Sequence, residues 1–129
     1  MRLAVGVDLV AVAEVQDAVA CFGDRYLERI YTAHELACAR GGGEVRARHL
    51  AGRFAAKEAA MKALRPSEHL PAWHSIEVRQ EPGGRCSLRL SGHAADLASR
   101  AGLSQFAVSL THTGDLAAAV VIATGRDDA

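Results

Sequence analysis

One stretch decides the fold of this chain: LAGRFAAKEAAMKAL, residues 50–64. It is rich in alanine and contains no helix breaker except Gly52, so it predicts a single long helix. We expect this helix to begin near Arg46 and to end at Leu64, before Arg65-Pro66-Ser67. Its large apolar residues recur at helical spacing and form one stripe: Leu50, Phe54, Met61 and Leu64.

Glu58 lies on that stripe, four residues after Phe54 and three before Met61. An ionised carboxylate on a buried face is costly unless it is paired with a cation or bound to a metal. Alternatively, the buried face ends early, and Glu58 lies at a solvated margin with Lys62 as its partner one turn away. The helix by itself leaves both interpretations open.

Shorter elements extend outward from this helix. Runs of β-branched or alternating apolar residues predict strands at 3–7, 75–79, 86–90, 106–110 and 117–123. Helical patterns predict short helices at 12–20, 33–39 and 94–101, the second of them beginning at a capping box of Thr32 and Glu35. Elements segregated in this way predict the α+β class: a small, mainly antiparallel sheet packed with one long and several short helices. We expect a single domain at 1–124 and a polar tail at 125–129.

The composition argues against several classes of function. Lysine and arginine number 15, as do aspartate and glutamate, which argues against nucleic acid and anionic membrane as partners. The chain reaches Asp8 before any long apolar run develops, so no signal peptide is expected, and no later run is long enough to cross a bilayer. The 3 cysteines have no CxxC spacing, which indicates reduced thiols and a cytoplasmic protein.

Two further polar residues stand at the ends of predicted strands. Asp8 directly follows the first strand, where an acid could equally cap the next helix or start a turn. His112 follows the strand 106–110, where a histidine could be structural or solvated. Strand ends are nevertheless places where binding groups concentrate.

The separated carboxylates of Asp8 and Glu58 would suit magnesium, which takes one or two carboxylates and completes its octahedron with phosphate oxygens and water. The chain has no GxxxxGK[ST] or GxGxxG loop, no Cys/His cluster for zinc and no GxSxG elbow. Cations that could offset phosphate charge gather on the long helix: Arg46, Arg48, Arg53, Lys57 and Lys62. Many phosphate enzymes share this pattern.

Taken in order, the motifs resemble the 4′-phosphopantetheinyl transferases of the holo-(acyl-carrier-protein) synthase type. Residues 50–64 resemble the long central motif of that family, which is highly specific. The agreement covers nearly the whole chain and includes Gly6-Val7-Asp8-Leu9-Val10, Ile30-Tyr31-Thr32, Trp73 with Ser75-Ile76-Glu77-Val78, and Ser109-Leu110-Thr111-His112-Thr113.

This resemblance implies transfer of the 4′-phosphopantetheine arm from coenzyme A to a serine of an apo acyl carrier protein, with release of adenosine 3′,5′-bisphosphate. The carrier would be of the fatty acid or polyketide type. The resemblance also implies the α+β fold of these enzymes and a homotrimer with active sites between subunits. Rival interpretations, a non-catalytic trimer that binds carrier protein or coenzyme A and a phosphate-ester hydrolase, fit less well.

Carried onto this sequence, the resemblance makes Asp8 and Glu58 the magnesium ligands. Glu58 would help to deprotonate the carrier serine, and Lys62 would neutralise diphosphate charge as the leaving oxygen departs. Asp8, Glu58 and Lys62 are thus the implied catalytic residues. The implied coenzyme A contacts are Arg53, Lys62, His112, Arg46 and Ser109, with Arg53 and His112 at the 3′-phosphate and Arg46 or Arg48 reaching across from a neighbour. Lys57 could serve a phosphate or a carboxylate, whereas Phe54 and Trp73 are expected to pack.

The chain departs from the family pattern at three places, of which Cys86, where a proline often follows the hairpin turn, is expected to change little. Glu14 stands where a basic residue that faces the acidic helix of the carrier is common, so we expect a less acidic or specialised carrier, such as one of a polyketide pathway. Arg65-Pro66-Ser67 replaces a glycine-containing loop. Arg65 there could contact phosphate or be solvated.

Overall fold

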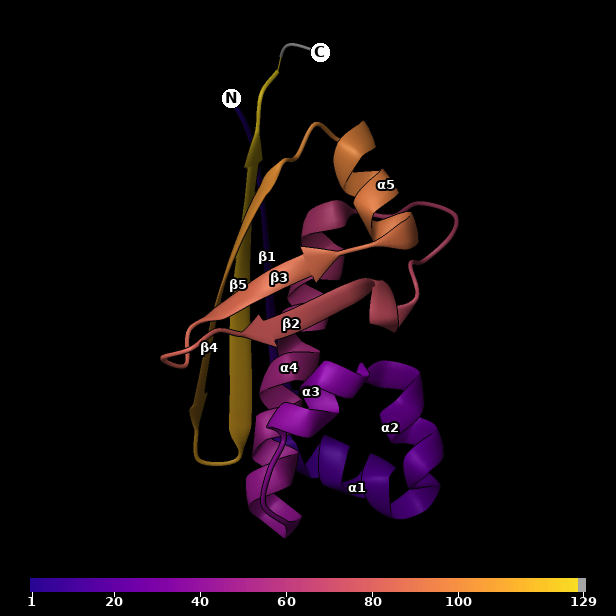
Figure 1. Ribbon diagram of the computed structural model, residues 1–129, viewed down its shortest axis with the longest axis vertical. Helices are drawn as coiled ribbons and strands as arrows, with labels where there is room; N and C mark the ends of the chain where they lie inside the picture. The colour runs from indigo at the N-terminus through magenta and orange to yellow at the C-terminus, as the bar shows by residue number, and fades with distance from the viewer. Residues whose placement is uncertain (128–129) are drawn as a thin grey trace.

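The computed structural model describes residues 1–127, in which two antiparallel sheets and five α-helices surround one core (Figure 1). The long helix α4 (Gly43–Leu64) lies against a three-stranded sheet and also touches a strand of the two-stranded sheet. The expected α+β class, with small antiparallel sheets and one long helix, is confirmed. The helix begins a few residues earlier than predicted and ends at the predicted Leu64.

The three-stranded sheet has the order β1 (Arg2–Ala11), β5 (Leu116–Gly125), β4 (Gln105–Thr113). The prediction that Asp8 ends the first strand is wrong. Strand β1 pairs with β5 along its whole length, from Arg2 opposite Gly125 to Ala11 opposite Leu116. The backbone of an acidic residue can still make the hydrogen bonds of a sheet, so a strand continues through it where the partner strand continues. Asp8 is therefore part of the sheet.

Small residues bring α4 close to this sheet. A Cβ atom added to Gly6 of β1 would lie 1.8 Å from the backbone oxygen of Ala59, so only glycine fits there. The predicted apolar stripe is only partly buried, because Phe54 and Met61 lie at its margin. The fully buried face of α4 is instead built largely from alanine: Ala51, Ala55, Ala56, Ala59 and Ala60.

Three short helices, α1 (Val12–Phe22), α2 (Asp24–Ile30) and α3 (Ala33–Cys38), cluster around the N-terminal half of α4 (Figure 1). Helix α2 was not predicted, because seven residues are too few to show a clear period. The capping box is confirmed: Glu35 N donates to Thr32 Oγ1 at 3.2 Å, and Thr32 N donates to Glu35 Oε1 at 2.8 Å.

The second sheet is the predicted hairpin of β2 (Ile76–Gln80) and β3 (Cys86–Leu90). A short 3₁₀ helix, η1 (Trp73–Ser75), precedes it and helix α5 (Gly92–Arg100) follows it. Trp73 packs on Phe54 with ring centroids 5.3 Å apart, which confirms the expected packing role of both rings.

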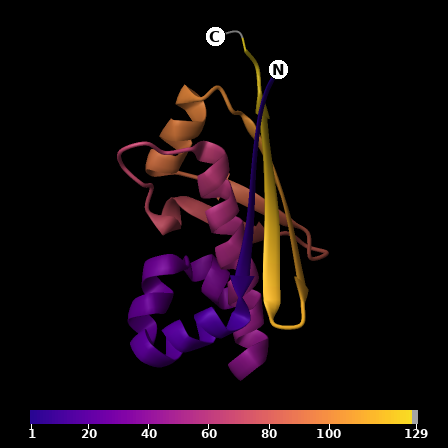
Figure 2. The same ribbon diagram turned by 180° about the vertical axis from the view of Figure 1, so that it is seen from behind.

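All five helices lie on one side of the three-stranded sheet, and its other face is bare (Figures 1 and 2). Because side chains alternate along a strand, the inner face of β1 carries Gly6, Asp8 and Val10. Four large apolar residues point outward and are more than three-fifths exposed: Leu3 69%, Val5 62%, Val7 63% and Leu9 63%. An apolar face of this kind on one sheet is typical of a surface that is covered in an assembly.

Arg65 caps the C-terminal end of helix α4 and is the only non-glycine residue with positive φ (51°) among residues 1–127. It takes the left-handed conformation that glycine favours at helix ends. At the other end of the chain, β5 includes Gly125, the first residue of the expected tail, and residues 128–129 lie outside the described part. Within residues 1–127, no helix combines the length and apolarity that crossing a bilayer requires.

Candidate active site

Asp8 and Glu58 come together where β1 runs beside α4. Lys62 joins them: its Nζ donates to Asp8 Oδ1 at 2.9 Å and to the backbone oxygen of Val7 at 3.0 Å. The Asp8 side chain is only 12% exposed, whereas that of Lys62 is 57% exposed. Asp8 does not cap helix α1, whose N-cap is Ala11. Lys62 makes its ion pair with Asp8 of β1 rather than with its helical neighbour Glu58.

The pKa shifts of Glu58 and Lys62 reflect the burial of Glu58 and the proximity of both groups to the carboxylate of Asp8. Burial raises the pKa of Glu58, and the negative charge of Asp8 raises it further. Glu14 of α1 contributes a smaller effect of the same sign. The hydrogen bond to Asp8 raises the pKa of Lys62, so its ammonium group stays charged. The result is a partly buried acid pair with a solvent-accessible cation beside it.

A separate pocket of about 500 Å³ lies on the other flank of α4. Arg53 and His112, the two predicted phosphate contacts, both line it, as do Arg40 and Arg48. The Arg53 Nη2 group donates to Gln80 Oε1 at 2.9 Å, which fixes the guanidinium at the mouth of the hairpin. Cys86 also lines this pocket and lies near Arg53. Guanidinium groups in such numbers suit a phosphate.

His49 also lines this pocket and was missed in the sequence. Burial, reinforced by the positive charge of Arg53, lowers the pKa of His49 to about 4, so its ring is neutral at pH 7. Within residues 1–127, its Nε2 is the buried side-chain atom that has no hydrogen-bond partner. A histidine four residues before Arg53 on a helix was the available signal, because residues at that spacing are neighbours.

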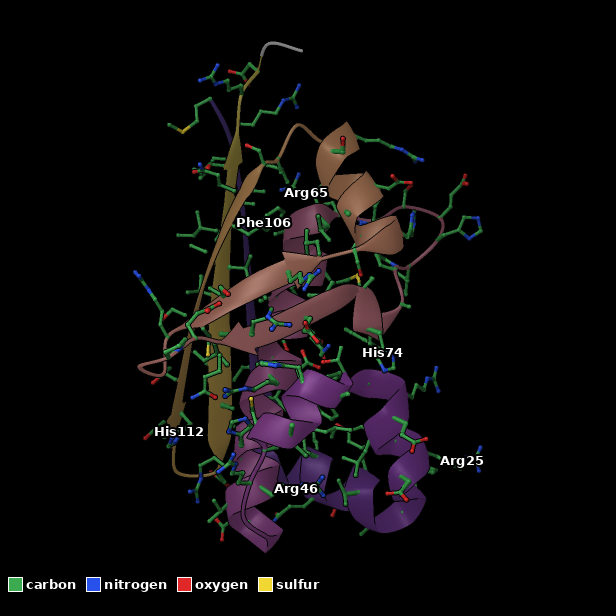
Figure 3. The ribbon with its side chains drawn as sticks, in the orientation of Figure 1. Arg25, Arg46, Arg65, His74, Phe106 and His112 are labelled. Atoms are coloured by element: carbon green, nitrogen blue, oxygen red, sulfur yellow. The ribbon has the colours of Figure 1, made fainter. Side chains whose placement is uncertain are left out.

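Arg46 and Ser109 lie apart from this pocket. Arg46 borders a different hollow, between α1 and the start of α4, together with Gln16 and Leu50. Figure 3 shows Arg46 near the lower end of α4 and His112 at the end of β4. Ser109 is three residues from His112 along β4 and points to the outer face of the sheet. One chain alone therefore does not bring Arg46 or Ser109 to the other coenzyme A residues.

Lys57, whose role the sequence left open, is buried and does not reach a phosphate site. Its Nζ lies 2.9 Å from Glu35 Oε1, and both side chains are 0% exposed. Of the two roles left open for Lys57, the contact with a carboxylate is confirmed, but the burial of this lysine was not predicted. The signal was its neighbourhood, since small residues on both sides of Lys57 in AAKEAA indicate tight packing around that helix.

The acid pair and the cationic pocket lie at opposite edges of the three-stranded sheet. Asp8 is on the edge strand β1 and His112 is on the edge strand β4, with β5 between them. Within residues 1–127, no group of three or more His, Cys, Asp or Glu side chains could hold a metal ion. A metal held by Asp8 and Glu58 would therefore need its remaining ligands from substrate and water.

Comparison with known proteins identifies the family. The model of the 4′-phosphopantetheinyl transferase superfamily matches residues 4–121. The holo-[acyl-carrier-protein] synthase of Chloroflexus aurantiacus is 46% identical over 133 aligned positions, which cover 92% of this chain and 95% of that protein. The synthase of Desulforudis audaxviator is 41% identical, with 99% and 97% covered.

Solved structures agree. An ACPS–CoA complex of Chronobacterium ammoniagenes has a TM-score of 0.83 at 31% identity, covering 98% of this chain and 99% of that one. The acyl carrier protein synthase of Mycobacterium tuberculosis has a TM-score of 0.75 at 35% identity, with 95% and 97% covered. The chain therefore belongs to the 4′-phosphopantetheinyl transferase superfamily, as an enzyme of the holo-[acyl-carrier-protein] synthase type.

Proposed function

We propose that this enzyme transfers the 4′-phosphopantetheine arm of coenzyme A to a serine of an apo acyl carrier protein, in a magnesium-dependent reaction. The serine Oγ forms a bond to the phosphorus on the pantetheine side of the diphosphate. The bond from that phosphorus to the bridging oxygen breaks, and adenosine 3′,5′-bisphosphate leaves with the electron pair. The observation that carries this proposal is the Asp8–Glu58 pair with Lys62 beside it.

The donor set fits magnesium. Asp8 and Glu58 offer hard carboxylate oxygens in proximity, and repulsion by the negative charge of Asp8 contributes to the raised pKa of Glu58. A divalent cation between them would relieve that repulsion. When bound, magnesium would supply Lewis-acid polarisation of the diphosphate oxygens. Asp8 and Glu58 are the residues that would hold it.

The protein side chains divide the remaining work. Glu58 is the acceptor for the proton of the serine hydroxyl. Lys62 is free to turn from Asp8 to the diphosphate, because its side chain is 57% exposed. Arg53 and His112 would bind the 3′-phosphate, and Arg48 lies in the same pocket to assist them.

A homotrimer would complete the site. The acid pair lies at the β1 edge and the cationic pocket lies at the β4 edge, so a ring of subunits would bring these edges of neighbouring copies together. The exposed apolar residues of β1 would become buried there. In such a ring, Arg46 and Ser109 would serve a neighbouring subunit. Light scattering should give about three times the 13.6 kDa chain mass, and a monomer with full activity would contradict this arrangement.

The surface facing the carrier protein carries an unusual charge. Helix α1 contains Glu14 and Asp17 but no lysine or arginine, and the next cations along the chain are Arg25 and Arg29 of α2. Figure 3 shows Arg25 on the outer side of α2, far from His112. Because Glu14 would repel an acidic carrier helix, we propose a less acidic or specialised carrier, such as one of a polyketide pathway.

A charge reversal tests the choice of carrier. Glu14→Arg is expected to slow modification of the true partner and to leave an ordinary fatty-acid carrier unaffected or faster. Modification rates measured for each carrier give the comparison. Equal or faster modification of every carrier tested would contradict the specialisation.

The function itself is tested by intact-mass spectrometry of a panel of apo carrier proteins mixed with enzyme, coenzyme A and magnesium. We expect one carrier to gain the phosphopantetheine arm, with adenosine 3′,5′-bisphosphate formed in equal amount. Chelation of the metal and Glu58→Gln should each abolish the gain. An enzyme that modifies no carrier, or a Glu58→Gln variant with full activity, would overturn the proposal. A cytoplasmic location remains a prediction.

A further inference from the structure

The ion pair of Lys57 and Glu35 is the most deeply buried charged group of the described chain. Both side chains are 0% exposed, and Lys57 Nζ lies 2.9 Å from Glu35 Oε1. Removing two charges from water is costly, and well-packed apolar residues often replace such pairs without loss of stability. Burial alone therefore does not explain why this position of the core holds two charges.

Each polar atom of the pair has its partners. Lys57 Nζ donates to the backbone oxygens of Ile76 at 2.6 Å and Trp73 at 3.0 Å, besides its contact with Glu35, so its three protons are used. Glu35 accepts from the backbone nitrogens of Thr32 at 2.8 Å and Val78 at 2.7 Å. These contacts connect α3, α4, η1 and β2. Directional bonds of this kind fix register, which apolar contact does not.

The pair acts on the helix that carries the active site. Lys57 directly precedes Glu58, and on an α-helix it points about 200° away from Ala59. Ala59 is the residue that Gly6 of β1 approaches most closely. Helix α4 is thus held from two roughly opposite sides, by β1 at Ala59 and by the ion pair at Lys57. Rotation of α4 about its axis, or sliding along it, would break the bonds of Lys57 and would also move Glu58 relative to Asp8.

We propose that Lys57 and Glu35 are positioning residues, which set the rotation and height of α4 and thereby the place of the Glu58 carboxylate beside Asp8. The inference rests on the proposed function and adds two residues to it that touch neither substrate nor metal. Glu58 is short and cannot follow a displaced site. The long side chains of Arg53 and Lys62 can adjust to the phosphates, so coenzyme A binding should depend less on the ion pair.

Two variants separate positioning from plain stability. Lys57→Met leaves Glu35 buried without its cation, whereas Lys57→Met combined with Glu35→Gln leaves no buried charge. We expect the double variant to melt above the single variant. Its kcat should nevertheless stay roughly tenfold or more below that of the parent, because a displacement of about 1 Å at a reacting group has effects of this size or larger. Its KM for coenzyme A should change less than about threefold.

Leu103→Ala is the matched control, because it removes buried apolar volume beside Ala98 and Phe106, in a region whose lining includes neither the ion pair nor the acid pair. We expect it to lower the melting temperature and to keep the parental kcat at temperatures where it is folded. A double variant whose kcat returns with its stability would overturn the inference. If the double variant does not fold, Glu35→Gln assayed below its melting temperature takes its place, and a kcat per folded molecule equal to that of Leu103→Ala would overturn it.

A structural readout separates this inference from the proposed function. A parent enzyme that modifies no carrier would refute the function but would leave the placement of Glu58 testable. Crystal structures of the parent and of the double variant (or of Glu35→Gln, if the double variant does not fold) should show the Glu58 carboxylate displaced from Asp8 by about 1 Å. An unchanged Glu58 in the variant would overturn the inference whatever the activity of the parent.

Discussion

Helix α4 carries two lysine–carboxylate pairs of equal length, and they behave differently. Lys57–Glu35 and Lys62–Asp8 both measure 2.9 Å. The first pair is fully buried, whereas the Lys62 side chain is 57% exposed. Burial lowers the pKa of Lys57, but the hydrogen bond to Asp8 raises that of Lys62. Ion pairs of equal length therefore differ in kind: Lys57–Glu35 is a fixed structural contact, whereas Lys62 is a cation that can change its partner.

The difference follows from the number of bonds that each lysine would lose on moving. Lys57 would take its hydrogen bonds from two backbone oxygens and leave a buried carboxylate without its cation, and water cannot easily replace it in the core. Lys62 would leave one backbone oxygen and Asp8, and water or a metal ion could compensate both. Exposure thus decides which lysine can take part in chemistry.

The largest effect is expected from Lys57→Met. Because Glu35 stays buried without its cation, the free energy of unfolding should fall by about 3–5 kcal/mol. Urea denaturation measures this as a lower midpoint with an unchanged slope. The same substitution at Lys62, on the same helix, is the control and should leave the midpoint nearly unchanged. A loss at Lys57 as small as that at Lys62 would remove the distinction between the two pairs.

The second prediction concerns Lys62, whose loss should affect activity rather than stability. Lys62→Met should lower the rate of phosphopantetheine transfer roughly a hundredfold, because the charge of the departing oxygen is left without its cation. Its melting temperature should stay within about 2 °C of that of the parent. Mass-spectrometric rates and thermal unfolding of one preparation give both quantities. Parental activity would show that Lys62 is only a surface partner of Asp8.

The smallest effect concerns Glu58 without metal. Its folded pKa is raised, so the ionised form destabilises the fold, and this cost accumulates as the pH rises from the unfolded-state pKa to the folded pKa. Glu58→Gln should therefore raise the metal-free melting temperature at pH 7.5 by roughly 1–3 °C. The gain should shrink as the pH falls towards 4, where the parent carboxyl is protonated.

With magnesium present, the parent should melt above the Glu58→Gln variant, because the metal stabilises only the parent. Glu68→Gln, an exposed site outside the acid pair, is the control for loss of a negative charge. A metal-free Glu58→Gln variant that melts below the parent at pH 7.5 would contradict the strained acid pair.

Much of this molecule could be predicted from its sequence. The central helix, the hairpin of β2 and β3 and the capping box at Thr32 depend on local chemistry, and the structure has them where patterns placed them. The pairing of β1 with β5 joins residues more than a hundred positions apart. No local signal shows that such a partner carries the strand past Asp8.

The site was predicted unevenly for the same reason. Asp8, Glu58 and Lys62 were found through their motifs, and the structure places them together. Glu35 was recognised only as the end of a capping box, although it also holds Lys57. A residue with a sufficient local explanation gives no sign of a second partner in another helix.

Strand β1 has a further consequence for how this family can vary in length. Its even-numbered residues carry Gly6 and Asp8 towards α4, and its odd-numbered residues form the apolar outer face. Inserting or deleting one residue would exchange these two faces along the rest of the strand. Substitutions at a single outer position change one side chain, whereas a one-residue indel would remove the acid and expose the wrong face together. We therefore expect homologous genes to vary freely in length at the 66–72 and 81–85 loops and to be free of indels across codons 3–10.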